Sequence, residues 1–466
     1  MKTMKEGLQV MLEEQKLSNP EPDRTWGESK KLQRCTGCEY AWYCSAACQR
    51  GEWLWHKHEC KCLKRVYPRR PTTSVRLMAR LIFRLKEGGD KIEEAVNDNW
   101  KRKFYDLMSH YDDLKADMRR MEILTNHMGV LKDYMGEENL PDIAELMGIF
   151  GRMCVNSFGV TDSDMNSVGT GLYLSASIFD HACNPNAFAT WEGIRITVRS
   201  MVDWPQGLDW SKVRISYIDV MNSNEARKKQ LLRNYYFCCD CEHCANEERG
   251  TLMNSINCGN ETCSVPVPLD MNLPESEPIG PCPGCGYKDF SPQTRADYYE
   301  AAQFSQQQFD EMGNRLYLDM SRAVLKLQGD LFHKLDVWHC KAMDTAFEAA
   351  VDLKKFEEAE KYGKENLEGN SFYYGSEHPT YGASMLRLGK IYVYHGKLKD
   401  GLLLIEKAQK ILKVSHGPDH TLYKEELLPL MKQTESELAY MAMTGESPAR
   451  NGDNDTSFKG LCRIGI

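Results

Sequence analysis

Apolar residues recur at helical spacing in two long stretches of the chain. In residues 74–160 they begin with Val75, Met78 and Leu81, which fall on one face of a helix. A second helical pattern begins near residue 295 and continues to about residue 445. The pattern therefore predicts a helical segment on each side of a central region.

The central region has the alternation and turn residues that are typical of strands. We predict strands over 187–191 and 194–202, joined by a turn at Glu192 and Gly193, and a short strand over 213–218. A chain of 466 residues has room for roughly two to four domains. Together these patterns predict an α+β multidomain protein.

The second helical stretch contains an internal repeat. GSEH at 375–378 recurs 42 residues later as GPDH at 417–420, and FEEA at 356–359 recurs at the same offset as LKDG at 398–401. Helix pairs repeated at such a period are typical of tetratricopeptide-like solenoids, which bind peptides or pack against a neighbouring domain. We predict an all-α, tetratricopeptide-like C-terminal domain.

Composition excludes several classes of protein. Hydrophobic residues make up 42% and charged residues 27% of the chain, which is typical of a globular protein. No run of about 18 apolar residues is present, and the N-terminus lacks the apolar core of a signal peptide. We therefore expect no membrane span and a cytoplasmic and nuclear location. The net charge of −8 predicts no chain-wide attraction to nucleic acid.

The 18 cysteines of the chain are better explained as metal ligands than as disulfides in a reducing compartment. Six cysteine and histidine donors lie within 26 residues: Cys35, Cys38, Cys44, Cys48, His56 and Cys60. Pairs of donors separated by two or three residues can both reach one tetrahedral zinc ion. This segment therefore predicts zinc.

Two further cysteine clusters follow. CCDCEHC provides three ligands and needs a fourth from elsewhere: Cys239, Cys241 and Cys244. The next cluster has four ligands of its own: Cys258, Cys263, Cys282 and Cys285. We predict a separate zinc ion there, and the alternative is an apolar loop lined by cysteines.

Several motifs resemble the SET and MYND domain-containing (SMYD) lysine methyltransferases. The donors at 35–60 follow the order of the MYND finger, DHACNPN at 180–186 resembles the family's NHSCxPN motif, and YID at 217–219 resembles its catalytic Tyr-x-Asp. NEARKKQLLRNYYFCCDC at 224–241 is also similar to the family. The resemblance covers most of residues 31–245. It implies a SET β-core, a MYND zinc finger, a helical insert and a post-SET zinc cluster.

The resemblance also implies the composition of the zinc sites. One finger site would consist of Cys35, Cys38, His56 and Cys60. The post-SET site would consist of Cys183, Cys239, Cys241 and Cys244. Cys44 and Cys48 would belong to a second finger site, for which residues 1–34 offer no cysteine. With the cluster that ends at Cys285, about three zinc ions are expected.

A methyl transfer reaction follows from the same resemblance. S-adenosylmethionine would be the donor and a lysine of a histone or another protein the acceptor, with Tyr217 as the catalytic residue. The residues that would contact the donor or wall the lysine channel are His110, Asn156, Ser177, Asp180, His181, Tyr235 and Phe237. An aromatic channel favours the neutral form of a lysine amine, whose pKa in water is about 10.4.

Three features depart from the family's pattern. Residues 1–34 contain no glycine-rich G-x-G turn, so we expect the family's first strands to be absent and a short helix with a polar link to take their place. At position 180 the family's asparagine is replaced by an aspartate, whose carboxylate only accepts hydrogen bonds. At 204–213 the sequence WPQGLDWSKV stands where the family has a GEEL turn. These departures keep an alternative open, namely a catalytically impaired zinc-binding scaffold that recruits peptide partners in transcriptional regulation.

The sequence also suggests the oligomeric state, the binding surfaces and the domain boundaries of the protein. We expect a monomer that binds peptides through the finger and the helical domain. A basic edge beside the finger is either a solvated face or a weak nucleic-acid contact: Lys64, Arg65, Arg69 and Arg70. The expected parts are an atypical segment at 1–30, the finger at 31–62, the insert at 63–160, the SET core at 161–223, the post-SET and additional zinc region at 224–290, the helical domain at 291–445 and a disordered tail at 446–466.

Overall fold

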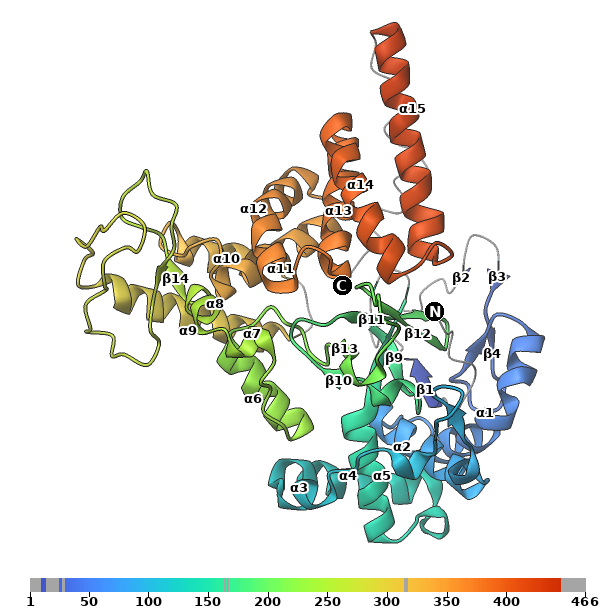
Figure 1. Ribbon diagram of the computed structural model, residues 1–466. Coiled ribbons are helices and arrows are strands. Elements are labelled where there is room, and N and C mark those ends of the chain that lie inside the picture. The colour runs from blue at the N-terminus through green and yellow to red at the C-terminus, as the bar shows by residue number, and fades with distance from the viewer. Residues whose placement is uncertain are drawn as a thin grey trace.

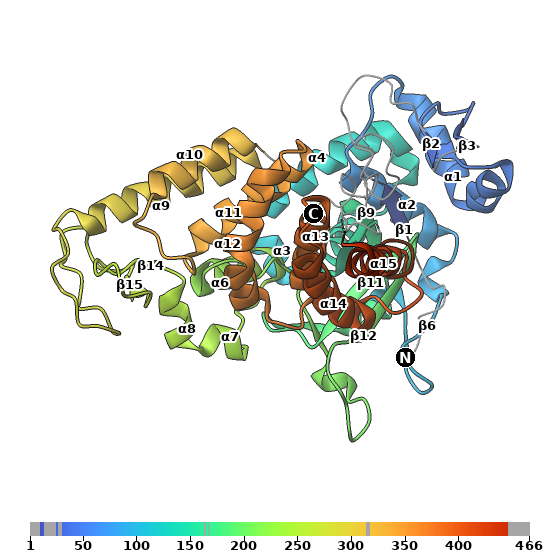
Figure 2. The same cartoon turned by 90° about the horizontal axis from the view of Figure 1, so that it is seen from above.

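The protein combines many helices with several small sheets. The structure is a computed structural model that describes residues 10–13, 25–26, 30–162, 165, 167–313 and 317–445. The tail predicted to be disordered lies outside the described residues. Figures 1 and 2 show strands at the centre, the N-terminal hairpins and α1 at one end, and α9 with the loops around β14 at the opposite end.

Two hairpins and one helix form the segment that precedes the insert. The elements are β2 (Thr25–Trp26), β3 (Lys30–Lys31), β4 (Gln33–Arg34), β5 (Trp42–Tyr43) and α1 (Ala46–Val66). Ser45 caps α1, because its hydroxyl accepts a hydrogen bond of 3.1 Å from the Cys48 amide. The helix continues past residue 62, where we expected the finger to end.

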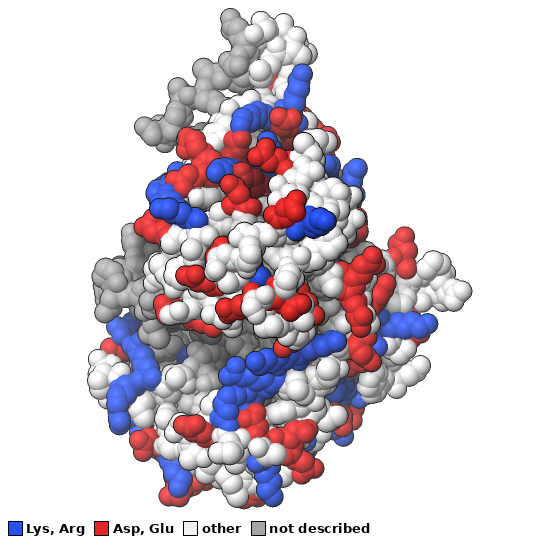
Figure 3. Space-filling view, turned by 90° about the vertical axis from the view of Figure 1, so that its left-hand side faces the viewer, with Lys and Arg blue, Asp and Glu red and all other residues white. Residues whose placement is uncertain are grey.

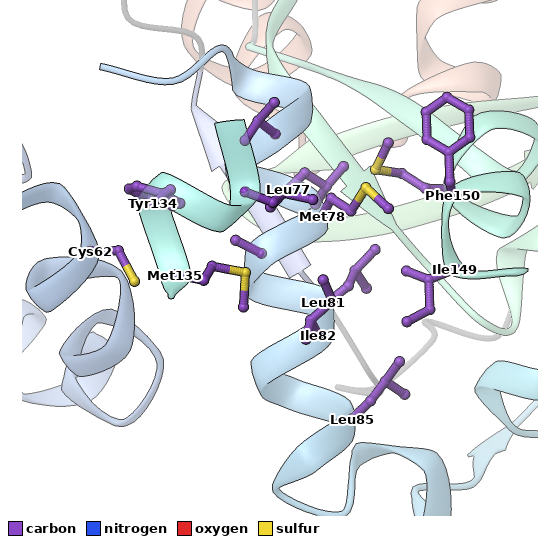
Figure 4. Packing of buried hydrophobic residues seen from close by; sticks show 14 of the residues in the cluster. Cys62, Leu77, Met78, Leu81, Ile82, Leu85, Tyr134, Met135, Ile149 and Phe150 are labelled. Atoms are coloured by element: carbon purple, nitrogen blue, oxygen red, sulfur yellow. The ribbon is translucent and has the colours of Figure 1, made fainter. Parts of the chain in front are cut away.

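The helical pattern predicted from residue 74 to about residue 160 is confirmed, and the region also contains a small hairpin. Its elements are α2 (Thr73–Lys86), β6 (Glu94–Ala95), β7 (Lys101–Arg102), α3 (Tyr111–Ala116), α4 (Met118–Met135) and α5 (Ile143–Asn156). The predicted apolar face of α2 is buried, and in Figure 4 Met78 and Leu81 lie on the side of α2 that faces Phe150 and Ile149 of α5. Burial of each such side chain stabilises the fold by about 1.5–3 kcal/mol.

An antiparallel sheet of three strands connects the insert with the N-terminal segment. It contains β1 (Val10–Glu13), β9 (Ser167–Leu172) and β8 (Ser157–Thr161), in that order. The short helix predicted in residues 1–34 is therefore wrong for residues 10–13. A run of three apolar residues fits either structure, and here the free edge of β9 supplies hydrogen-bond partners for a strand.

The strands predicted in the central region are confirmed. β11 (Ala187–Glu192) and β12 (Arg195–Ser200) form a hairpin, with Gly193 at a φ of +60° in its turn. β13 (Arg214–Ile215) pairs in parallel with β10 (Asp180–His181). β13 is shorter than predicted because the backbone amide of Tyr217, two residues after the strand ends, donates to a histidine side chain instead of to a strand.

The rest of the chain is mainly helical. After β13 come α6 (Asn224–Tyr235), α7 (Glu242–Ala245), α8 (Glu247–Leu252), β14 (Ser255–Ile256) and β15 (Val267–Pro268). The following helices are α9 (Thr294–Met312), α10 (Leu318–Gln328), α11 (Val337–Asp352), α12 (Phe356–Tyr374), α13 (Pro379–Tyr394), α14 (Leu398–Ser415) and α15 (Leu428–Thr444). In Figure 1 α11 to α14 lie above the central strands, α9 and α10 lie to the left of them, and α15 projects away.

The predicted repeat corresponds to helix boundaries. α12 begins at Phe356 and α14 at Leu398, which confirms the offset of 42 residues. The repeated histidine has a structural role in both copies. Nδ1 of His378 accepts from the Thr380 amide at 3.2 Å, and Nδ1 of His420 accepts from the Leu422 amide at 3.3 Å.

The described surface carries charges of both signs. On the face shown in Figure 3, Lys and Arg side chains are interspersed with Asp and Glu. At the basic edge beside the finger, Arg65 lies 3.9 Å from Glu138, and the Arg70 guanidinium lies over the Tyr40 ring. Among the helices that the structure describes, none combines the length and the apolar character that a membrane span requires.

Candidate functional site

A cavity of about 300 Å³ lies beside the central strands. Its walls come from β8, β11, the segment that follows β13 and the end of α6. Six aromatic side chains contribute to the lining: Phe158, Phe179, Phe188, Trp191, Tyr217 and Tyr235. The volume is at the lower end of the range for small-ligand pockets, roughly 300–1,000 Å³. An aromatic pocket of this size suits one long, narrow side chain.

Tyr217 is held at the cavity wall by hydrogen bonds at both ends. Its hydroxyl donates to the Phe179 carbonyl at 2.6 Å, and its backbone amide donates to Nδ1 of His181 at 3.0 Å. Burial raises the pKa of Tyr217 well above its usual value. The phenol therefore keeps its proton at neutral pH and has a fixed orientation.

The segment at 204–213 packs against a residue that holds the Tyr217 hydroxyl. Within it, Trp210 stacks on Phe179, with ring centroids 5.9 Å apart and an angle of 17° between the planes. Phe179 is the residue whose carbonyl accepts from Tyr217. The segment that departs from the family pattern thus packs against a residue that positions the Tyr217 hydroxyl.

The predicted zinc ligands gather into three compact clusters. They are Cys35, Cys38, His56 and Cys60; Cys183, Cys239, Cys241 and Cys244; and Cys258, Cys263, Cys282 and Cys285. A tetrahedral zinc ion with Zn–S bonds of about 2.3 Å separates its sulfur atoms by about 3.8 Å. The Sγ atoms of Cys35 and Cys60 are 3.8 Å apart, and those of Cys183 and Cys244 are 3.5 Å apart. The geometry of the clusters fits zinc.

The Cys183 cluster is connected directly to the cavity. Nε2 of His181 lies 3.3 Å from the Cys183 Sγ, while Nδ1 of the same ring accepts from the Tyr217 amide. Burial lowers the pKa of His181 to about 4, so the ring is neutral. Arg227 is only 1% exposed and donates from Nε to the Cys183 Sγ at 3.3 Å. Its charge offsets part of the negative charge of four thiolates around a divalent ion.

The finger cluster is anchored to the insert by a buried carboxylate. Glu59 is 4% exposed and accepts from Nε of Arg76 at 2.8 Å and from Nη1 of Arg80 at 3.1 Å. Nδ1 of His56 lies 3.9 Å from the same carboxylate, and Nε2 of His56 lies 3.5 Å from the Cys38 Sγ. Glu59 therefore lies beside a predicted zinc ligand and joins the helix that carries this ligand to α2.

Cys44 and Cys48 do not belong to a described cluster. Both are exposed, and among the described residues no third ligand joins them. Residues 1–34 contain neither cysteine nor histidine. The finger thus presents one group of four ligands and one exposed pair of thiols.

Comparisons with known proteins agree with this arrangement. A family model for the MYND finger matches residues 23–60. The chain is similar to histone-lysine N-methyltransferase SMYD3 of Homo sapiens, with 28% identity over 419 residues, 89% of this chain and 88% of the relative. It is also similar to histone-lysine N-methyltransferase ASHR1 of Arabidopsis thaliana (25% identity; 90% and 89% covered) and to N-lysine methyltransferase SMYD2-B of Danio rerio (25%; 86% of each chain).

Over most of its length the chain is similar to lysine methyltransferases of the SMYD family. The resemblance stated from the motifs at 35–60, 180–186 and 217–219 is thereby confirmed. The named relatives are lysine methyltransferases, which supports a role in protein-lysine methylation for this chain.

Three of the residues that the SMYD resemblance assigned to cofactor or channel line the cavity. They are Asn156, Ser177 and Tyr235, beside Tyr217 itself. The Asn156 amide donates to the Met108 carbonyl at 2.8 Å, and the Tyr235 hydroxyl donates to the Tyr217 carbonyl at 3.3 Å. Side chains that line the cavity therefore restrain the backbone at Met108 and Tyr217.

The other assigned residues do not line this cavity. The rings of His181 and Phe237 contact Tyr217, with centroids 5.4 Å and 6.4 Å from its ring. Asp180 is exposed on β10. His110 instead pairs with Asp113 at 2.9 Å and contacts the ring of Tyr236. No described hydrogen bond, ion pair or ring contact joins His110 to the other assigned residues.

Several cavity residues were not found from the sequence. Phe158, Phe188 and Trp191 line the cavity, but no motif contains them. β11 was predicted, but strand alternation places Phe188 and Trp191 on opposite faces, because they are three positions apart. Alternation therefore could not have shown that both line one cavity with Phe158 of β8.

Proposed function

We propose that the chain is an S-adenosylmethionine-dependent protein-lysine N-methyltransferase that acts on histone or non-histone lysines. One observation carries the proposal. Tyr217 has a fixed hydroxyl, lines an aromatic cavity that suits a lysine side chain, and contacts His181 and Phe237 away from that lining. This arrangement supports a reaction in which the phenol lies between a channel for the acceptor lysine and the residues proposed for the donor.

The cavity residues would prepare the amine for reaction. Their rings disfavour a charged ammonium group, so a lysine that enters is shifted to the neutral, nucleophilic amine. The rings also exclude water, and Tyr217 orients the amine without becoming charged. When bound, S-adenosylmethionine supplies the electrophilic methyl group.

The residues on the other side of Tyr217 fit a positively charged donor. The Asp180 carboxylate is exposed, and no described residue donates a hydrogen bond or forms an ion pair with it. It can therefore accept from an ammonium group of the donor, close to the rings of His181 and Phe237. On this side of Tyr217 the donor would be held by Asp180, His181 and Phe237. The other residues assigned to the donor from the sequence lie elsewhere: Asn156, Ser177 and Tyr235 line the cavity, and His110 contacts Asp113 and Tyr236.

The proposal includes the family's domain organisation. The strands β9 to β13 would belong to a SET core, the Cys183 cluster would be its post-SET zinc site, and α9 to α15 would be a tetratricopeptide-like domain. We propose that the three clusters hold zinc, and that the protein is a monomer in the cytoplasm and nucleus. A weak nucleic-acid contact at the basic edge beside the finger remains part of the proposal.

A second function is favoured by the surface of the finger. Trp53 and Leu54 on α1 are 48% and 51% exposed, an arrangement that suits the binding of apolar peptides. A catalytically impaired scaffold would recruit peptide partners through this surface and through the helical repeats. Such a protein would not need a pocket for a methyl donor.

Calorimetric titration of zinc-loaded protein with S-adenosylmethionine separates the two functions. We expect saturable binding by the wild type and loss of binding by His181→Ala. His127→Ala, which changes a partly buried histidine of the insert, is the matched control and should bind like the wild type. A folded wild-type protein that does not bind the donor would exclude the enzyme and favour the scaffold.

A further inference from the structure

The C-terminal helices contact the segment of Tyr217 through one tyrosine hydroxyl. Tyr374, the last residue of α12, donates from its hydroxyl to Oδ1 of Asp219 at 2.8 Å. The same oxygen accepts from the Met221 amide at 3.0 Å. Asp219 lies two residues after Tyr217, so this contact restrains the backbone that carries the Tyr217 side chain.

Through His378, Tyr374 is also connected to a second wall of the cavity. The Tyr374 ring stacks on His378, with centroids 5.3 Å apart and planes at 23°. The His378 ring meets Phe188 edge-on at 5.5 Å, and Phe188 lines the cavity from β11. His378 cannot turn freely, because its Nδ1 accepts from the Thr380 amide.

These contacts form a continuous series from Asp219 through Tyr374 and His378 to Phe188. The series begins beside Tyr217 on one wall and ends on another wall. No member of the series between Asp219 and Phe188 lines the cavity. Tyr374 and His378 of the C-terminal helices therefore fix the separation of the walls that carry Tyr217 and Phe188, and they do so without contacting a ligand in the cavity.

We propose that Tyr374 is a positioning residue, which sets the placement of Tyr217 relative to Phe188 and thereby the rate of methyl transfer to lysine. The inference rests on the proposed function. Small displacements of reacting groups cost large factors in rate, so a contact outside the cavity can control chemistry within it.

Other contacts would keep the helices in place when this hydroxyl is removed. The Lys341 ammonium donates to the Asn222 side chain, and Arg249 donates to the Phe372 carbonyl. Both contacts join the C-terminal helices to the segment between β13 and β14. Tyr374→Phe should therefore loosen the Tyr217 segment and leave the docking of the helices intact.

The neighbouring tyrosine provides a matched control. The Tyr373 hydroxyl donates to the Leu335 carbonyl at 2.9 Å, which is a contact within the C-terminal part of the chain. Tyr373→Phe and Tyr374→Phe remove the same atom from adjacent residues of one helix. Only the second change removes a bond to the Tyr217 segment.

The test measures kcat and KM for a lysine peptide, the Kd for S-adenosylmethionine and the unfolding midpoint of full-length, zinc-loaded proteins. In Tyr374→Phe we expect kcat to fall about tenfold, as for loss of one hydrogen bond to a charged group, with unchanged donor Kd and midpoint. Tyr373→Phe should keep kcat within about twofold of the wild type. Equal kcat values for Tyr374→Phe and the wild type would overturn the inference and leave the proposed function standing.

Variants of Asp219 identify the bond responsible. Asp219→Asn keeps an oxygen that can accept from Tyr374 and should retain more activity than Asp219→Ala. In the Asp219→Ala background, Tyr374→Phe should cause no further loss. A full additional loss would show that Tyr374 acts by another route and would overturn the inference. A wild type that binds the donor but transfers no methyl group would instead remove the proposed function, and the inference with it.

Discussion

The finger cluster and the cavity are held together by different kinds of contact. The finger ligands lie between Cys35 and Cys60, on one loop and one helix, and a buried carboxylate attaches them to α2. The cavity walls come from residues between Val155 and Tyr235, and the C-terminal helices brace two of these walls. The finger can therefore form locally, whereas the cavity depends on the assembly of distant parts of the chain.

The Cys183 cluster combines both kinds of contact. Three of its ligands lie in a short segment, at Cys239, Cys241 and Cys244, and the fourth comes from the loop after β10. His181 lies between this cluster and the Tyr217 amide. The metal site thus supports the cavity, while the other two clusters lie at opposite ends of the molecule, near α1 and near β14 (Figure 2).

Loss of a ligand from the Cys183 cluster should have the largest effect. In Cys239→Ser we expect one zinc ion fewer and loss of donor binding, because the cluster supports His181 and Tyr217. Structural zinc contributes about 10 kcal/mol or more to folding in zinc-finger peptides, so the unfolding midpoint should also fall. Mass spectrometry of the intact protein counts the ions, and calorimetry measures donor binding.

Cys285→Ser is the matched control for this experiment. It also removes one ligand and should also cost one zinc ion, but its cluster makes no described contact with the cavity residues. Donor binding should therefore persist. Equal loss of donor binding in both variants would contradict the distinction between a cluster that supports the cavity and one that does not.

A smaller effect is expected from Glu59→Gln, which tests how the finger is attached. The change leaves Arg76 and Arg80 without their buried carboxylate, and the free energy of unfolding should fall by about 3–5 kcal/mol. Urea denaturation of the zinc-loaded protein measures this difference. Glu52→Gln alters a more exposed partner of Arg80 and should cost about 1 kcal/mol or less. If the free energy of unfolding fell by the same amount in both variants, the buried Glu59 carboxylate would not be the anchor.

The smallest effect is expected at the exposed thiols of the finger. The double change Cys44→Ser and Cys48→Ser should leave the zinc count unchanged and alter the free energy of unfolding by less than about 0.5 kcal/mol. The reason is that no third ligand joins this pair in the part of the chain that the structure describes. Loss of a zinc ion from this variant would instead demonstrate a second finger site.

The metal clusters could be predicted from the sequence because their ligands lie at short, regular spacings. The cluster from Cys258 to Cys285 could be predicted from its own segment alone. Cys183 was assigned through the family resemblance, since nothing in its local sequence indicates the partner near Cys239. Tyr217 was assigned in the same way.

Contacts between distant segments could not be predicted. The bond from Tyr374 to Asp219 joins residues 155 positions apart, and neither residue has a local pattern that indicates the other. The strand at residues 10–13 depends on the free edge of β9, so helical spacing gave the wrong structure there. Phe188 was placed on a strand, but its position in the cavity depends on packing between separate elements.

The most direct test of the account is methyl transfer itself. Zinc-loaded protein is incubated with isotopically labelled S-adenosylmethionine and purified histones, and methylated lysines are identified by mass spectrometry. We predict labelled lysine with the wild type and at least about a hundredfold less with Tyr217→Phe, at unchanged zinc content and donor affinity. Equal labelling by both proteins, or none by a wild type that binds the donor, would contradict the account.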